Sequence, residues 1–415
     1  MNGIGSAARD RTHVRASASA TGSQSGEPRV LLVPDGLIPT TYIIEPVLRH
    51  ALGSRFAGLR LAADLDGATL QREALLFSRV CDPRHGWLPG WLSRRGARYA
   101  YFLDDNLWAF RSDSDVGRYY ARRDVLATLD RFIRNAACVL VSSWPLRDAL
   151  IARFGDIDVR HVTAPFDFSL VDRDAPSRAS VLRVGYAGSE RGEAFAPVTE
   201  AIERVLHSHR GAVEFEFIGY VPPALVGRSG VTVFPAITNY AEFLAFKQWR
   251  GWHVGLAPLN DDAFNRAKTN NKFREYGALG IAGVYSRVEP YVSSVINDGN
   301  GLLVAHSPDA WASALVRLIE EPGLKGELGL EARRHVWNFH RLDAAAGSWC
   351  SLLGDVGLTP AKDGRLSRMS AWIASARSKL GTRLHAQHRL LAEIGPARYL
   401  RRLVSRARIK AFNSN

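Results

Sequence analysis

The sequence is poor in cysteine and has no long apolar run. Its three cysteines, Cys81, Cys138 and Cys350, lie far apart and form no CxxC or Cys/His pattern, which argues against a disulfide framework and against a zinc site. We expect them to be reduced and mostly buried. No apolar run approaches the ~20 residues that span a bilayer, and residues 1–29 lack the apolar centre of a signal peptide. We therefore expect a cytoplasmic protein.

Acidic residues are scarce only at the end of the chain. The net charge is +13, but residues 361–415 hold 13 Lys and Arg against 2 Asp and Glu, a net charge of +11, so that only +2 remains for the first 360 residues. The body of the protein is nearly neutral, and its function is better sought in a pocket than in a basic face. We do not expect nucleic-acid binding, because no recognised nucleic-acid module accompanies the basic tail.

The length of 415 residues and a hydrophobic content of 46% are enough for two domains with ample cores. Apolar runs of strand length alternate with segments of helical periodicity, which predicts doubly wound parallel sheets. The expected strands are 30–34, 59–63, 74–77, 99–103, 138–142 and 159–163 in the first half, and 182–187, 213–218, 231–234, 253–259, 283–286 and 301–304 in the second. The expected helices are 46–57, 118–136, 145–154, 196–209, 240–250, 308–320 and 323–338.

Polar stretches without periodicity divide the chain. Residues 1–28 are rich in Ser, Ala, Gly and Arg, and we expect them to be disordered. The stretch VDRDAPSRAS at 171–180 marks the domain boundary. We therefore predict a disordered segment at 1–28 and three further parts. These are an N-terminal Rossmann-like acceptor domain at 29–175, a C-terminal Rossmann-like nucleotide-sugar domain at 176–355 and a basic helical tail at 356–415.

The segment NRAKTNNKFREYGALGI, residues 265–281, follows an expected buried strand and a polar loop. On one helix, Lys268, Lys272 and Glu275 would share a face. Together with Arg266, the lysines offer the cations that a nucleotide diphosphate needs, and Glu275 can accept hydrogen bonds from ribose hydroxyls. The alternative is a solvated helix face with a weak surface pair between Lys272 and Glu275.

A strand also leads into a glycine turn in GYAGSERGE, residues 185–193. Glycine lets the backbone approach a phosphate closely, and a following helix N-terminus supplies unpaired N–H donors, so Gly188 and Ser189 are candidate phosphate contacts. The alternative is a tight strand-to-helix turn that needs small residues for packing alone.

The third pattern is FLDDNLW at 102–108, where Asp104 and Asp105 end an apolar strand. At the carboxyl end of a parallel strand such carboxylates face the ligand crevice, where one of them can orient an acceptor hydroxyl, serve as a base or bind a divalent metal. The alternative is a cap of the next turn. Glu289, behind a later strand, is a further candidate to face a ligand. The 12 histidines show no metal-like pairing, and we predict no metal site.

The turn YAGS, the segment at 255–291 and the earlier FLDDNLW together resemble the family 4 type glycosyltransferases of GT-B fold, closest to divergent bacterial members of surface polysaccharide synthesis. The resemblance covers roughly residues 29–350, and the second half carries most of it. It implies two Rossmann-like doubly wound domains facing across a cleft, with a basic helical C-terminal extension in this chain. A nucleotide sugar would bind the second domain and a glycan or lipid-linked acceptor the first.

The resemblance also implies roles for the residues. Gly188 and Ser189 would lie at the diphosphate, Lys268 and Arg266 would neutralise it, and Glu275 would bind the ribose. Family members commonly carry a second glutamate eight positions before Glu275, where this chain has Ala267. Glu289 and Asp262 are the candidates to replace that carboxylate. The reaction implied is attack of an acceptor hydroxyl on the anomeric carbon, with no cofactor and no metal strictly required.

The expected function is therefore transfer of a sugar from a nucleotide diphosphate sugar in bacterial surface polysaccharide synthesis. Two alternatives stay open, namely a nucleotide-sugar epimerase or hydrolase of the same fold and, because of Ala267, a catalytically inactive GT-B scaffold. Basic residues interleaved with apolar ones in 365–391 and 396–412 favour an amphipathic helix on an anionic membrane surface. We therefore expect peripheral attachment of residues 361–415 to the inner membrane, the alternative being a solvated basic extension.

Overall fold

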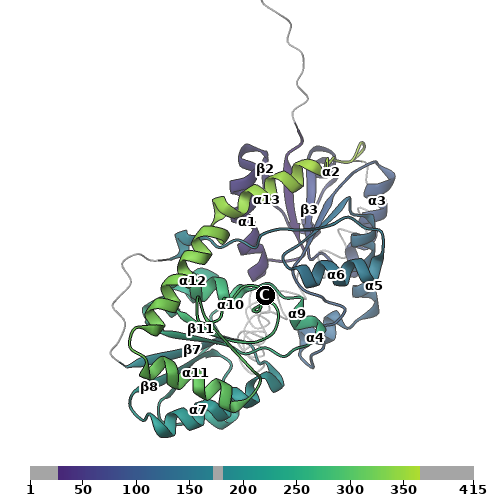
Figure 1. Ribbon diagram of the computed structural model, residues 1–415. Helices are drawn as coiled ribbons and strands as arrows, with labels where there is room; N and C mark the ends of the chain where they lie inside the picture. Colours follow the sequence, from purple (N-terminus) through teal and green to yellow (C-terminus); the bar gives the residue numbers. More distant parts are fainter. Residues whose placement is uncertain (1–26, 172–180, 365–415) are drawn as a thin grey trace, which may run out of the picture.

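The protein forms two α/β domains, which lie one above the other in Figure 1. The computed structural model describes residues 27–171 and 181–364. Each domain is built on a sheet of six parallel strands, and each sheet has a hydrophobic core on either face. The two Rossmann-like doubly wound domains that the sequence predicts are thus confirmed. The basic C-terminal extension lies outside the described residues from 365 onward.

The first sheet has the strand order β2-β1-β3-β4-β5-β6. Its strands are β1 (Val30–Pro34), β2 (Phe56–Leu59), β3 (Ala74–Ser78), β4 (Ala100–Leu103), β5 (Cys138–Val141) and β6 (Val159–His161). The helices of this part are α1 (Pro39–Leu52), α2 (Gly67–Arg72), α3 (Leu88–Arg94), α4 (Asp115–Tyr120), α5 (Arg123–Asn135) and α6 (Trp144–Phe154).

The second sheet has the order β12-β11-β10-β7-β8-β9. Its strands are β7 (Leu182–Gly188), β8 (Val213–Gly219), β9 (Val231–Phe234), β10 (Val254–Ala257), β11 (Ala282–Ser286) and β12 (Leu302–Val304). The helices that follow Leu182 are α7 (Ala196–Ser208), α8 (Tyr240–Trp249), α9 (Ala263–Arg266), α10 (Asn271–Ala278), α11 (Pro308–Glu320), α12 (Leu324–His340) and α13 (Leu342–Asp355).

The strands form where short apolar runs permit burial on both faces of a sheet. Every residue of β1, β3, β4, β5, β10, β11 and β12 is buried, as expected for parallel strands covered by helices on either side. Side-chain caps fix several helix starts: the Ser143 hydroxyl accepts from the backbone N–H of Leu146 at the start of α6, and Asn239 caps α8 in the same way.

Three expected elements differ from the structure by more than two residues in their bounds. The helix expected at 46–57 is α1, which begins seven residues earlier with Pro39 in its first turn and contains Pro46. The strand expected at 59–63 is β2, which ends at Leu59. The helix expected at 118–136 is divided into α4 and α5, because the backbone of Arg122 is extended between them.

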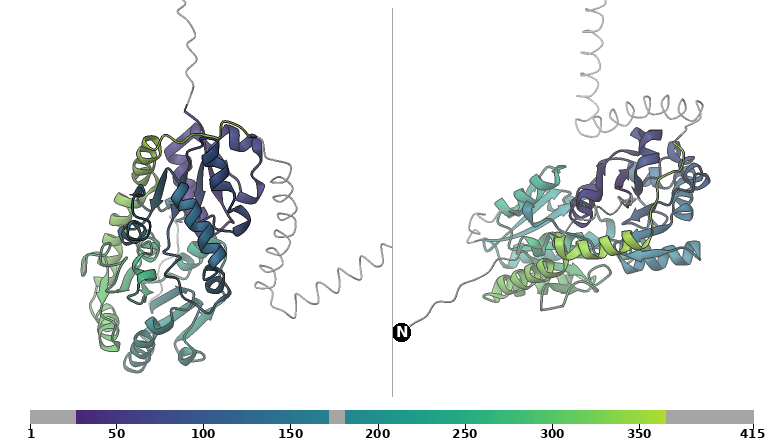
Figure 2. Two further views of the ribbon diagram at one scale, coloured as in Figure 1. Left: turned by 90° about the vertical axis from the view of Figure 1, so that its right-hand side faces the viewer. Right: turned by 90° about the horizontal axis from the view of Figure 1, so that it is seen from above.

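The end of the described chain returns to the first domain. Helix α13, green to yellow in Figure 1, lies beside α1, and the views of Figure 2 show it in the same place. Trp349 packs on Phe102 with ring centroids 5.4 Å apart, and its indole N–H donates to the carbonyl of Thr163 at 2.9 Å. Beyond α13, the backbone N–H of Ala361 donates to the carbonyl of Leu70 at 2.8 Å.

The domain limits are therefore corrected at one end. Residues 342–355, placed by the sequence in the second domain, and residues 356–364, placed in the tail, both pack on the first domain. The predicted boundary between 175 and 176 lies in the undescribed stretch 172–180, and the segment predicted as disordered lies outside the described residues except for 27 and 28. None of the helices between 27 and 364 that the structure describes is both long and apolar enough to cross a bilayer.

Candidate active site

The two domains meet where the carboxyl ends of their sheets face each other. In the second domain, the chain between β10 and α10 reaches over to the loops that follow β4 and β5. We name residues 264–268 the cross-domain segment. Its contacts with the first domain include three between specific groups. The rings of Phe264 and Phe110 stack with centroids 4.4 Å apart, the carbonyl of Ala267 accepts from the Ser143 hydroxyl at 2.7 Å, and the Lys268 ammonium lies 3.4 Å from Oδ1 of Asp105.

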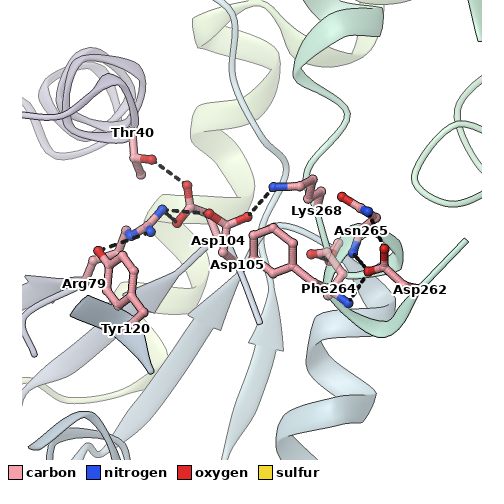
Figure 3. A network of polar contacts seen from close by, with 11 residues as sticks. Thr40, Arg79, Asp104, Asp105, Tyr120, Asp262, Phe264, Asn265 and Lys268 are labelled. Atoms are coloured by element: carbon pink, nitrogen blue, oxygen red, sulfur yellow. Dashed lines mark hydrogen bonds and ion pairs between the residues drawn. The ribbon is translucent and has the colours of Figure 1, made fainter. Parts of the chain in front are cut away.

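Two adjacent aspartates end β4 and share one guanidinium (Figure 3). Nη1 of Arg79 lies 3.0 Å from Oδ1 of Asp104 and 2.9 Å from Oδ2 of Asp105. The other oxygen of Asp104 accepts a hydrogen bond from the Thr40 hydroxyl, while the other oxygen of Asp105 faces Lys268. The predicted pair of carboxylates therefore lies at the domain boundary, and each member has its own partner.

Arg79 follows β3 directly and adopts a left-handed backbone, with a φ of 54°. This region is uncommon for a residue other than glycine and is typical of functional sites. Nη2 of Arg79 lies 3.4 Å from the Tyr120 hydroxyl, and only 12% of the side chain is exposed. The guanidinium thus fixes two carboxylates from a buried position.

The surroundings push the pKa values of the two aspartates apart. Burial raises the pKa of Asp104, and the charge of Arg79 offsets this only in part. Burial would raise the pKa of Asp105 too, but the charges of Lys268 and Arg79 bring it below its ordinary value. Two neighbouring carboxylates with divergent pKa values are a common source of acid and base roles. Asp104 is the member better suited to take up a proton.

Lys268 lies between the domains, with 20% of its side chain exposed. Its ammonium lies 3.9 Å from the centre of the Phe264 ring, a cation–π contact. Burial lowers the pKa of Lys268, opposed by Asp105. The positive charge of Arg191 also lowers this pKa, which means that the two cations lie near enough to repel each other.

The prediction that Lys268 shares a helix face with Lys272 and Glu275 is wrong. Asp262 caps the short helix α9, which ends at Arg266, and α10 begins only at Asn271. Lys268 lies in the turn between these helices. Asn270 precedes α10 without capping it through its side chain, which bonds to the Ser294 hydroxyl and to Arg274. The break between α9 and α10 turns Lys268 toward the first domain.

The glycine turn after β7 is present as expected. Gly188 has a φ of +151°, and a Cβ atom there would lie 3.1 Å from the Tyr186 hydroxyl, so the position requires glycine. The Tyr186 hydroxyl donates to the carbonyl of Ser189 at 2.5 Å, and Ser189 is exposed. A 3-10 turn at Gly192–Phe195 then leads into α7.

Arg191, in this same turn, is a candidate that the sequence prediction missed. Burial would lower its pKa, but Tyr186 and Tyr291 raise it, and Asp105 of the other domain adds to the rise. Its guanidinium therefore stays charged and lies in the field of the cross-domain ion pair. Arg191 and Lys268 form a pair of cations beside the exposed turn at Ser189.

Glu275 is locked into an ion pair inside the second domain. Its Oε2 lies 2.8 Å from Nζ of Lys247 and 3.3 Å from Nζ of Lys272. Burial would raise the pKa of Glu275, but these two lysines lower it to about 2. Both ammonium groups contact the same oxygen, so Oε1 is the atom through which the carboxylate can accept hydrogen bonds from a ligand. The weak surface pair considered for Lys272 and Glu275 is thus a buried network that includes Lys247.

Two candidates lie apart from these groups. Arg266 is exposed and pairs with Asp261, and both side chains are more than half exposed. Glu289 is partly exposed, and its Oε2 accepts from the Ser293 hydroxyl at 2.7 Å. The side-chain bonds of Arg266 and Glu289 thus go to Asp261 and Ser293 and not to Lys268 or Asp105.

The position of the expected second glutamate is buried. Ala267 has 1% of its surface exposed and packs in the core of the first domain. Asp262, named as a replacement, is occupied as the cap of α9, where its Oδ1 accepts from the N–H groups of Phe264 and Asn265 at 2.9 and 2.8 Å. Asp262 is therefore engaged in capping α9, and Glu289 stays a prediction as the replacing carboxylate.

The residues that the sequence missed are Arg79, Arg191 and Lys247. In a sequence, single cations in loops look like ordinary surface residues, and Lys247 lies on a helix without a clear division into apolar and polar faces. Only Arg191 could have been found from the sequence, because it lies two residues beyond the predicted phosphate contacts Gly188 and Ser189. In the described ranges 27–171 and 181–364, no group of three His, Cys, Asp or Glu residues could hold a metal ion.

Comparison with known proteins places the chain by fold. No family model matches the sequence. Over 171 residues it is 29% identical to the D-inositol 3-phosphate glycosyltransferase of Salinispora arenicola, a match that covers 41% of this chain. The matched part spans 33%, about a third, of the length of that relative.

Two solved structures resemble the whole described body. Sucrose-phosphate synthase from Thermosynechococcus elongatus has a TM-score of 0.59 at 16% identity, with 79% of this chain and 99% of that chain covered. Anabaena HepE, solved in complex with UDP and glucose, has a TM-score of 0.59 at 12% identity, with 79% and 100% covered. At these identities the likeness concerns the fold, and it confirms the GT-B architecture.

Proposed function

We propose that the protein is a glycosyltransferase that moves a sugar from a nucleotide diphosphate sugar to a glycan or lipid-linked acceptor. The observation that carries this proposal is the pairing of Lys268 with Asp105 across the domain boundary. It joins a cationic group on the second domain, suited to a diphosphate, to a carboxylate pair on the first domain, suited to a hydroxyl. The partial similarity to the D-inositol 3-phosphate glycosyltransferase supports the same class, and the fold is shared with HepE, which was solved with UDP and glucose.

The donor would bind on the second domain. Lys268 and Arg191 would neutralise the diphosphate, beside the turn at Gly188 and Ser189, where the backbone can come close. Oε1 of Glu275 would accept hydrogen bonds from the ribose hydroxyls. Lys247 and Lys272 keep this carboxylate ionised, so it acts as an acceptor and not as a proton donor.

The reaction follows from these positions. An acceptor hydroxyl attacks the anomeric carbon, the bond from that carbon to the diphosphate oxygen breaks, and its electron pair leaves with the nucleoside diphosphate. Negative charge grows on the diphosphate in the transition state, and cations fixed beside it stabilise that charge. The proton of the acceptor hydroxyl passes to Asp104, whose pKa is raised by burial. We propose that no cofactor or metal ion is needed.

The acceptor and the cellular setting are finer proposals. The sequence resemblance to bacterial enzymes of surface polysaccharide synthesis favours a glycan or lipid-linked acceptor of the cell envelope. The basic residues of 361–415 favour a peripheral position on the inner membrane, where lipid-linked acceptors are within reach of a cytoplasmic enzyme.

A screen of nucleotide sugars tests the class. Purified protein would be titrated with UDP, GDP and dTDP by calorimetry, and the nucleotide that binds would define the donors to assay for release of that nucleotide with candidate acceptors. Saturable binding of one nucleoside diphosphate and acceptor-dependent release from its sugar would support the proposal. Absence of saturable binding of all three would refute the donor site.

A further inference from the structure

The ion pair between Lys268 and Asp105 holds a cation of the candidate donor site against a carboxylate of the other domain. The Lys268 ammonium lies 3.4 Å from Oδ1 of Asp105. Charge-assisted N–H···O bonds usually measure about 2.7–2.9 Å, so this pair is long. On its other side, the ammonium lies 3.9 Å from the centre of the Phe264 ring. Lys268 is therefore restrained loosely on both sides.

Asp105 is held much more firmly from its own domain. Its second oxygen, Oδ2, lies 2.9 Å from Nη1 of Arg79. Arg79 is itself fixed by Asp104 and by the Tyr120 hydroxyl. Asp105 would therefore stay in place if Lys268 moved away. The pair has one movable member, the lysine, and one fixed member, the aspartate.

A nucleoside diphosphate and Asp105 would compete for the same cation. Both are anions, and the diphosphate carries more charge. Arg191, which acts electrostatically on both Lys268 and Asp105, adds a second attraction for the diphosphate on the side of the second domain. Once Lys268 turns to the diphosphate, Asp105 faces the acceptor side with Arg79 as its neighbour.

We propose that Asp105 is an internal counter-ion of Lys268, which the donor diphosphate displaces, and that the freed Asp105 carboxylate then positions the acceptor hydroxyl. This inference rests on the proposed glycosyltransferase function and adds a coupling between its two substrates. The donor binds against competition from Asp105, and its binding exposes the carboxylate that the acceptor needs. Donor binding therefore precedes productive binding of the acceptor.

Replacement of Asp105 separates the two effects. Asp105→Asn keeps the shape of the side chain and removes the charge that competes for Lys268. We expect UDP, or whichever of UDP, GDP and dTDP the wild type binds, to bind about fivefold or more tightly to this variant, and pyrophosphate to show the same gain. Turnover should fall at the same time, because the acceptor loses its carboxylate. A merely structural role for Asp105 would not tighten binding.

Two further variants complete the experiment. Asp104→Asn removes the adjacent carboxylate, which bonds to Thr40 and Arg79 and acts on Lys268 through its charge alone, less strongly than Asp105 does. This variant should therefore gain less affinity for the nucleotide than Asp105→Asn gains. Asp105→Glu retains the charge and should bind the nucleotide like the wild type. Calorimetry at one ionic strength gives the affinities, and a thermal melt shows that each variant is folded.

The outcomes distinguish this inference from the proposed function. Tighter binding with slower turnover in Asp105→Asn, and not in Asp104→Asn, supports the inference. Unchanged or weaker binding in Asp105→Asn, or an equal gain in Asp104→Asn, overturns it while the donor site stands. A wild type that binds none of the three nucleotides and no pyrophosphate overturns the proposed function and the inference together.

Discussion

Nζ of Lys247 lies 2.8 Å from Oε2 of Glu275 inside the second domain, where the lysine side chain is fully buried and the glutamate side chain is 7% exposed. The ammonium also lies 4.0 Å from the centre of the Phe243 ring. Burial lowers the pKa of Lys247 to about 8, against the attraction of Glu275. The Lys247 ammonium, whose burial is costly, thus lies beside the Glu275 carboxylate that is proposed to bind ribose.

Lys247→Met should destabilise the protein because it leaves the carboxylate of Glu275 buried with only the more distant Lys272 as partner. We expect a loss of about 3 kcal/mol in the free energy of unfolding, since breaking one side of a buried pair is costly. Urea denaturation would measure it. The double variant Lys247→Met/Glu275→Gln should recover part of this stability. Its nucleotide binding should be weak, because the carboxylate proposed to accept hydrogen bonds from ribose is absent. Equal stability of wild type and Lys247→Met would show that the pair is of no structural consequence.

His340 provides a pH-dependent prediction near the linker between the domains. Its Nδ1 lies 2.8 Å from the carbonyl of Ala164, and burial lowers its pKa from 6.5 to about 3. Below pH 6.5 the unfolded chain takes up this proton more readily than the folded protein, so stability is lost as the pH falls from about 6.5 toward 3.

The expected loss from His340 between pH 7 and pH 5 is roughly 1 kcal/mol, allowing for the partial exposure of the side chain. His340→Gln should flatten the pH dependence of the free energy of unfolding by this amount. The comparison of wild type and variant at each pH cancels other titrating groups, such as His85. Parallel curves for the two proteins would contradict the assignment.

The order of strands and helices was predictable because buried parallel strands leave short apolar runs that polar loops separate. Such a run predicts β1 at its observed bounds. The run at 231–234 likewise predicts the bounds of β9, although this edge strand is not buried. The return of α13 to the first domain was not predictable, since the apolar face of Trp349 and Leu353 does not tell which domain it covers. Periodicity indicates that a helix face is buried, but it does not indicate which part of the protein that face packs against.

The candidate site was predictable in its residue types and less so in its geometry. Lys268 and Asp105 were both named, but from separate segments 163 positions apart, and no pattern within either segment indicates that they meet. Lys268 was placed on a helix because the spacing to Glu275 fits one, whereas α9 ends at Arg266 and α10 begins only at Asn271. The spacing of charged residues does not indicate this break, which decides the direction of the Lys268 side chain.

The two neighbouring cations of the cross-domain segment offer a matched comparison for donor binding. Lys268→Ala should weaken binding of the nucleoside diphosphate about tenfold or more, because it removes a charge-assisted contact from a largely buried place. Arg266→Ala should change affinity less than about twofold, since Arg266 is exposed and paired with Asp261. Calorimetry with the nucleotide that binds the wild type measures both. Equal effects of the two substitutions would place the diphosphate elsewhere.

Arg79→Met should impair turnover more than donor binding. Without the guanidinium, Asp104 and Asp105 lose their shared positive partner, and the pKa of each should rise. We expect the rate to fall by a factor on the order of 100, with nucleotide affinity kept within severalfold, and the pH optimum to move upward. Arg79→Lys should restore part of the rate. A fall in affinity that matches the fall in rate would indicate a donor-binding role.

Removal of the basic tail tests the proposed membrane association. The truncation should begin at residue 365, because Ala361 is buried in the core of the first domain and bonded to Leu70. Residues 365–415 carry 12 Lys and Arg against one Glu, and each cation near an anionic surface contributes ~1 kcal/mol. The full chain should therefore sediment with phosphatidylglycerol vesicles at low salt and dissociate in about 0.5 M salt, where the Debye length is only a few ångströms. The truncated chain should stay in the supernatant while it binds the nucleotide as before. If it still sediments with the vesicles, the membrane contact lies in the two domains and not in the tail.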